Sequence, residues 1–157
     1  MNKRAAFKTV LEKFRQELKQ QERAAGAARE GASGDEVSSE SKYDTRATES
    51  SYLARGHAMQ YEALIDDLRT LEAYRVPDYE NDESIGTGAM VEVSVGRERQ
   101  HYFILPRGGG IFVEFDGIEI AVLNPRSPLA KCLVGNKTGH SFEAPNGGKA
   151  GKIRTVC

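Results

Sequence analysis

The sequence lacks the features typical of secreted, membrane-spanning or nucleic-acid-coating proteins. It has only two cysteines, Cys132 and Cys157, which lie far apart and form no CxxC pair, so a cytoplasmic location with reduced thiols is expected. No run of 18 apolar residues occurs, so no membrane span is predicted. The N-terminus is basic, but no apolar h-region follows it, which argues against a signal peptide.

Tryptophan is absent, and neither sign of charge is in large excess. The 157 residues have a net charge of −1 at pH 7. A general binder of nucleic acid or of anionic membranes needs a large excess of lysine and arginine. The composition, 39% hydrophobic and 29% charged, is typical of a soluble protein, and the length suggests one or two domains.

The first half has helical periodicity. Large apolar residues recur at spacings of four, three and four in Phe7, Leu11, Phe14 and Leu18. This stripe predicts an amphipathic helix from about Lys3 to Arg29.

A second periodic run begins after an acidic stretch. The tetrapeptide Ser41–Asp44 matches a capping box, and Pro77 ends the run. Its apolar seam consists of Leu53, His57, Tyr61, Leu64, Leu68 and Leu71, in which His57 is expected to pack or to form a buried hydrogen bond. About ten residues connect the two runs, so we predict an antiparallel helical hairpin.

The second half has the alternation of strands. We predict strands at Met90–Val95, Gln100–Leu105, Ile111–Phe115, Ile118–Leu123 and about Lys152–Val156, separated by glycine-rich turns and the hairpin turn Asp116-Gly117. One short helix is predicted after Arg126, with Ser127 as N-cap, Pro128 at the first position and Gly135 past its end.

These segments define an α+β protein in two parts. Residues 1–76 are predicted to form an antiparallel coiled-coil arm, and residues 77–157 a small antiparallel β domain with one short helix. A domain of about 80 residues has a diameter of about 30 Å, whereas the two helices would be roughly 40 and 50 Å long. The arm must therefore project unless a partner covers it.

The predicted turn of the arm, about residues 31–41, is acidic. Residues Glu30–Asp44 contain five acids and one base, a net charge of −4. A hydrophilic loop with acids near a helix N-terminus is one interpretation. The other is that the arm carries Asp35, Glu36 and Glu40 into a confined site, where they complete an Mg²⁺ site whose other ligands belong to another protein.

The segment Ser127–Val156 contains an ordered set of helix-starting, apolar and glycine residues: Ser127, Pro128, Leu129, Leu133, Gly135, Gly139, Pro145 and Gly148. Through these residues the chain resembles the Gre-type bacterial transcript-cleavage factors (GreA/GreB-like), which share this C-terminal signature. Residues Glu40–Gln60 resemble the start of the second helix in a Gre-like subgroup. The similarity covers nearly the whole chain.

The resemblance implies an FKBP-like C-terminal domain that docks on the rim of the RNA polymerase secondary channel, with Arg126, Ser127 and Pro128 as the docking segment. The arm would pass down the channel, and the tip acids Asp35, Glu36 and Glu40 would assist a polymerase Mg²⁺ in cutting backtracked RNA. Asp35 and Glu40 would contact this ion only in the complex. The factor would be a monomeric accessory protein rather than an enzyme, without a tightly bound cofactor and with only indirect contact to nucleic acid.

Two departures from the family pattern leave alternatives open. The family's tip reads G-D-x-x-E-N, but here Ser38 follows Gly34-Asp35 at the position of the second acid. Glu36 or Glu40 would then supply the second carboxylate, or the factor inhibits or regulates polymerase without cleavage. The docking segment has Arg126 where the family often has aspartate.

Two further functions compete with this hypothesis. One is an isomerase or chaperone whose pocket is lined by the sheet-domain aromatics, which we otherwise expect in the core: Tyr102, Phe103, Phe112, Phe115 and Phe142. The other is a structural protein that dimerises through the arm.

Overall fold

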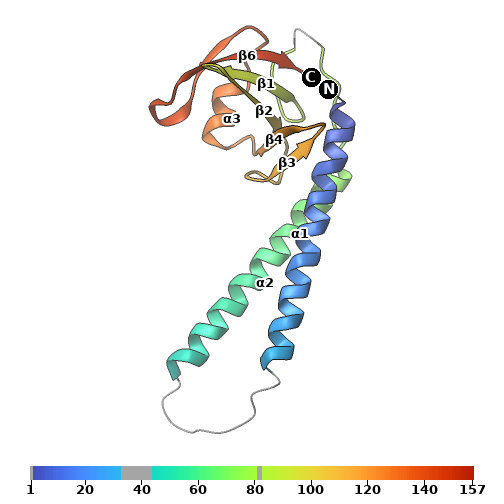
Figure 1. Cartoon of the computed structure of the whole chain (residues 1–157), viewed down its shortest axis with the longest axis vertical. Coiled ribbons are helices and arrows are strands. Elements are labelled where there is room, and N and C mark those ends of the chain that lie inside the picture. Colours follow the sequence, from blue (N-terminus) through green and yellow to red (C-terminus); the bar gives the residue numbers. More distant parts are fainter. Residues whose placement is uncertain (1, 33–43, 81–82) are drawn as a thin grey trace.

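A computed structural model describes residues 2–32, 44–80 and 83–157. Two long helices form an arm that projects from a small sheet domain, and both chain termini lie at the junction of arm and sheet (Figure 1). This arrangement confirms the predicted helical hairpin followed by a β domain with one short helix. Whether residues 1–76 and 77–157 are separate folding units stays a prediction.

The arm consists of α1 (Lys3–Ala32) and α2 (Asp44–Ala73). The helices run antiparallel, because Arg15 pairs with Glu72 near the sheet at 2.7 Å and Glu22 accepts a hydrogen bond from Tyr61 farther out at 2.6 Å. Each helix has 30 residues, which corresponds to a length of about 45 Å.

The sheet domain contains a six-stranded sheet in the order β3-β4-β2-β1-β6-β5. The strands are β1 (Met90–Val95), β2 (Glu98–Ile104), β3 (Phe112–Phe115), β4 (Ile118–Leu123), β5 (Ser141–Glu143) and β6 (Ala150–Val156). The short helix α3 (Pro128–Leu133) follows β4, and a single 3-10 turn, η1 (Pro145–Gly147), precedes β6. The predicted strands and helix are therefore present, together with the short strand β5.

One strand pair corrects the expectation of a purely antiparallel sheet. β2 and β4 are parallel, with His101 opposite Ile120 and Ile104 opposite Leu123, so the sheet is mixed. The hairpin turn Asp116-Gly117 makes β3 and β4 antiparallel, as predicted, and both turn residues have positive φ, as a type I′ turn requires. Because β3 takes the edge position, β4 returns beside β2 in the same direction.

Each face of the sheet has its own core. One core joins the sheet to the base of the arm, where Phe7, Val10 and Phe14 of α1 and Leu71 of α2 pack against Phe103 and neighbouring residues. The other lies under α3, where Leu133 packs with residues of β1, β2, β5 and β6. The arm is thus anchored through its base.

The loop between β2 and β3 closes the junction with the arm. Gly108 has φ +82°, and a Cβ built there would lie 2.5 Å from Cζ of Phe14. Beside it, Arg107 approaches Asp66 and Asp67 of α2 at 3.7 and 3.8 Å. Glycine permits this close approach because it has no side chain and tolerates positive φ.

The predicted apolar seam does not continue along the arm. Leu71 is fully buried, and Leu64 and Leu68 pack against the same core, but Leu53 is 64% exposed. His57 is also exposed, so the expectation that it packs or is buried is wrong. The sequence period repeats beyond the base, but the described side chains of Tyr52–Gln60 lie in solvent.

Candidate functional site

The far end of the arm is the first candidate site. The described helix ends Ala32 and Asp44 lie at the end of the arm away from the sheet (Figure 1). Asp35, Glu36 and Glu40 lie in the segment 33–43, outside the described residues, so their predicted role toward Mg²⁺ stays untested. Among the side chains that the structure describes, those of residues 2–27, 52–80 and 83–157, no group of three or more His, Cys, Asp or Glu could hold a metal ion.

The segment before α3 is the second candidate. The Ser127 hydroxyl accepts the backbone N–H of Ala130 at 3.3 Å, and Pro128 occupies the first turn, so both residues begin the helix as predicted. The Arg126 backbone N–H donates to Oδ1 of Asn124 at 2.9 Å. Arg126 and Pro128 are exposed and Ser127 is half-buried. The structure thus explains Ser127 and Pro128 as helix-starting residues, and the docking role of the segment remains a prediction.

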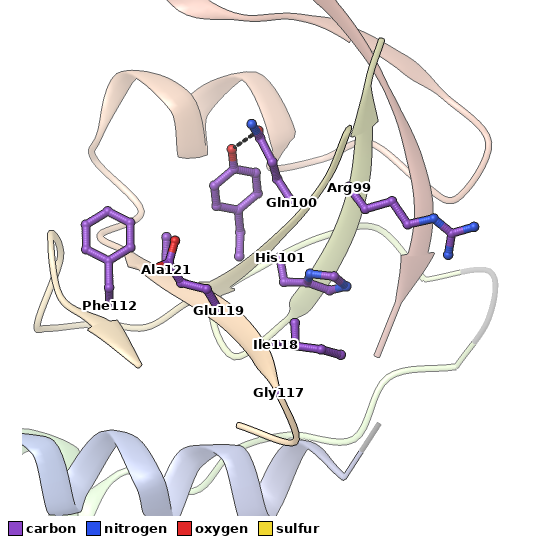
Figure 2. A pocket seen from close by; sticks show the side chains of 9 residues that line it. Arg99, Gln100, His101, Phe112, Gly117, Ile118, Glu119 and Ala121 are labelled. Atoms are coloured by element: carbon purple, nitrogen blue, oxygen red, sulfur yellow. Dashed lines mark hydrogen bonds between the residues drawn. The ribbon is translucent and has the colours of Figure 1, made fainter. Parts of the chain in front are cut away.

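A third candidate is a groove on the sheet, and two of the five aromatics that the isomerase alternative placed in a pocket, Tyr102 and Phe112, line it. It has a volume of about 440 Å³ and lies on β2, β4 and the edge strand β3, with Tyr102, Phe112, Glu119 and Ala121 in its lining (Figure 2). The Tyr102 hydroxyl donates to Oε1 of Gln100 at 2.6 Å, and burial raises the pKa of Tyr102 above its ordinary value. The phenol is therefore neutral at physiological pH and acts as a fixed wall of the groove.

Phe112 marks this groove and corrects the expectation that the sheet aromatics are core residues. Phe103 and Phe142 are buried, but Phe112 is 57% exposed. The sequence held part of this information, namely the face of the sheet on which Phe112 lies. A two-residue Asp-Gly turn fixes the register of β3 and β4, which places Phe112 and Glu114 on one face and the buried Val113 on the other.

The described helices include none that is long and apolar enough to cross a membrane.

The fold defines a class of protein with a two-helix arm on a mixed-sheet domain, and three solved structures that are similar to this chain are all of one factor, Gfh1. No protein-family model matches the chain, and no curated protein matches it. Among solved structures, the chain is similar to GreA factor homolog 1 (Gfh1) of Thermus thermophilus, with 20% identity, a TM-score of 0.38 and coverage of 98% of this chain and 93% of that one. It is also similar to Thermus aquaticus Gfh1, with 22% identity, a TM-score of 0.37 and coverage of 97% and 92%.

A third structure, described as the transcription factor Gfh1, has 21% identity, a TM-score of 0.38 and coverage of 97% of this chain and 91% of that one.

Proposed function

We propose that this chain is an accessory transcription factor that binds RNA polymerase through its secondary channel. The observation that carries the proposal is the arm: two 30-residue helices anchored at one end in the sheet domain and projecting from it (Figure 1). Among the described side chains of the arm, those that pack into the core lie at its base, so the anchor takes up only that end of the helices. Such a probe suits a narrow channel that leads to a distant active site.

The chemistry proposed for the tip follows from its charge. The net charge of −4 over Glu30–Asp44 contrasts with 13 acids and 13 bases over residues 1–75, so the excess is local. Carboxylates from Asp35, Glu36 and Glu40 would raise the occupancy of a second Mg²⁺ in a two-metal polymerase site. The factor would then hold no ion of its own and would act only in the complex, while its sheet domain docks outside the channel, with Arg126, Ser127 and Pro128 as the proposed contact.

A cleavage assay on a backtracked polymerase complex tests this function. We expect the full chain to change the rate of RNA cleavage, and a variant with Asp35, Glu36 and Glu40 replaced by alanine to lose the effect while it still binds polymerase. The matched control replaces Glu12, Glu62 and Glu143, which are acids away from the tip, with alanine. Absence of binding by the unmodified chain would refute the proposal.

A non-cleaving regulator is the second candidate, and Ser38 favours it, because a serine stands where the family pattern has its second acid. In that case the full chain slows elongation or cleavage, and Ser38→Glu gains cleavage activity. An isomerase assay on a proline peptide and a concentration series for dimerisation address the two remaining alternatives.

A further inference from the structure

Part of one face of the sheet is covered by no other element of the described chain. On the side of the sheet that α3 partly covers, the strand register aligns Phe112 and Glu114 of β3 with Ala121 and Glu119 of β4, and Ala121 with Tyr102 of β2. α1 packs against the opposite face of β3, through Val113 and its neighbours. We call the bare surface the β3–β4 face, and define it by Gln100, Tyr102, Phe112, Glu114, Glu119 and Ala121.

Two glutamates on this face oppose each other directly. Glu114 and Glu119 are cross-strand partners, both are exposed, and neither forms a salt bridge with a basic side chain in the described part of the chain. Like charges directly opposite on neighbouring strands destabilise a sheet. The arrangement therefore lowers the stability of the isolated molecule, and a cation brought by a partner would relieve it.

Apolar surface adjoins the two carboxylates. Phe112, which is 57% exposed, stands at the edge of the groove beside Ala121 and Glu119 (Figure 2). Arg99 lies on the far rim, but its Nη1 is held by Glu92 at 2.9 Å, so it does not neutralise the pair of glutamates.

β3 is also an edge strand, and an exposed edge with an aromatic side chain is a surface that proteins normally cover.

We propose that the β3–β4 face docks a protein segment of RNA polymerase in which a lysine or arginine stands beside an aliphatic side chain. The cation would bind between Glu114 and Glu119, and the aliphatic group would pack on Phe112 and Ala121. This inference rests on the proposed function and adds a docking surface distinct from Arg126–Pro128. Nucleic acid fits the face poorly, because its phosphates would meet two carboxylates.

A charge reversal separates docking from folding. Glu119→Lys places opposite charges across the strands, so we expect a higher Tm together with at least about a tenfold rise in the Kd for purified RNA polymerase. Glu143→Lys is the matched control, since Glu143 is an exposed glutamate on β5, the other edge of the sheet, and we expect it to bind like the unmodified chain. Unchanged affinity of the Glu119→Lys variant would overturn the proposal.

Photocrosslinking identifies the bound segment. With p-benzoylphenylalanine in place of Phe112, crosslinks to polymerase peptides that contain lysine or arginine next to an aliphatic residue support the proposal. The control carries the same probe at Val134, which is 41% exposed next to α3. A bound chain that crosslinks only to nucleic acid, or not at all, refutes the docking surface and leaves the proposed function standing. If purified RNA polymerase does not bind the full chain, both the docking surface and the proposed function are refuted.

Discussion

At the scale of single residues, Lys3 is the least expected feature of the fold. It is only 7% exposed, its Nζ has no hydrogen-bond partner in the described chain, and that atom lies 4.6 Å from the centroid of the Tyr79 ring. Burial lowers the pKa of Lys3, although Cys157, Asp78 and Glu83 oppose the shift. The charged form is therefore less favourable in the folded state than in the unfolded chain.

This shift predicts a pH dependence of stability. Between the lowered pKa of folded Lys3 and its ordinary value of about 10.4, the unfolded chain binds more protons, so the free energy of unfolding rises with pH. Lys3→Met removes this rise and should stabilise the protein at neutral pH. Urea unfolding of both proteins from pH 7 to 9.5 measures the difference, because the tyrosines that begin to titrate near the upper end of this range are the same in both proteins. Parallel curves would show that Lys3 is solvated in the folded protein.

The structural role of a residue was predictable from the sequence where it depends on adjacent residues. It was not predictable where it depends on residues far away in the chain. Ser127 caps α3 and Asp116-Gly117 forms its turn because each needs only a few adjacent residues. Phe112 was assigned to the core because its hydrophobicity is local information, but its exposure depends on how far α3 extends over the sheet. The tip acids, the metal role and the docking segment remain predictions.

At the scale of elements, the strand positions followed from alternation but the strand order did not. The parallel pairing of β2 and β4 depends on β3 taking the edge, and the loop that takes the chain there is residues 105–111. That loop also contacts the arm through Gly108, whose missing side chain admits the ring of Phe14. Its glycines looked like ordinary turn residues in the sequence, because Phe14, the ring that requires Gly108, lies 94 positions away.

A single substitution in this loop tests how much the contact between the loop and the arm contributes to stability. Gly108→Ala meets both a positive φ and a contact of 2.5 Å with Phe14, so we expect a loss of about 2–4 kcal/mol in the free energy of unfolding. Gly110→Ala is the control, because it shares the positive φ, +93°, but has open space around the added atom; about 1 kcal/mol is expected there. Equal losses in chemical denaturation would mean that backbone strain alone accounts for the effect.

At the scale of the whole molecule, the arm is stabilised mainly at its base, where it meets the sheet. The core that includes Phe14 and Leu71 draws on both helices and on strands β1 to β4. Farther out, α1 and α2 are joined by the Tyr61–Glu22 hydrogen bond, and that bond raises the pKa of Tyr61. The base of the arm is thus part of the globular core. The described outer part extends the arm away from the sheet and adds little to the free energy of unfolding.

Two leucines of the predicted seam test whether the base of the arm contributes more to the free energy of unfolding than its outer part. A uniform coiled coil would make Leu53 and Leu71 equivalent, but Leu71 is 0% exposed and Leu53 is 64% exposed. We therefore expect Leu71→Ala to cost about 2–5 kcal/mol and Leu53→Ala less than about 0.5 kcal/mol in the free energy of unfolding, from urea denaturation followed by circular dichroism. Hydrogen exchange should be slowest around Phe14 and Leu71 and faster toward Tyr52. Similar costs for the two variants would show that the helices stay packed along the arm, and that its outer half is part of the folding core.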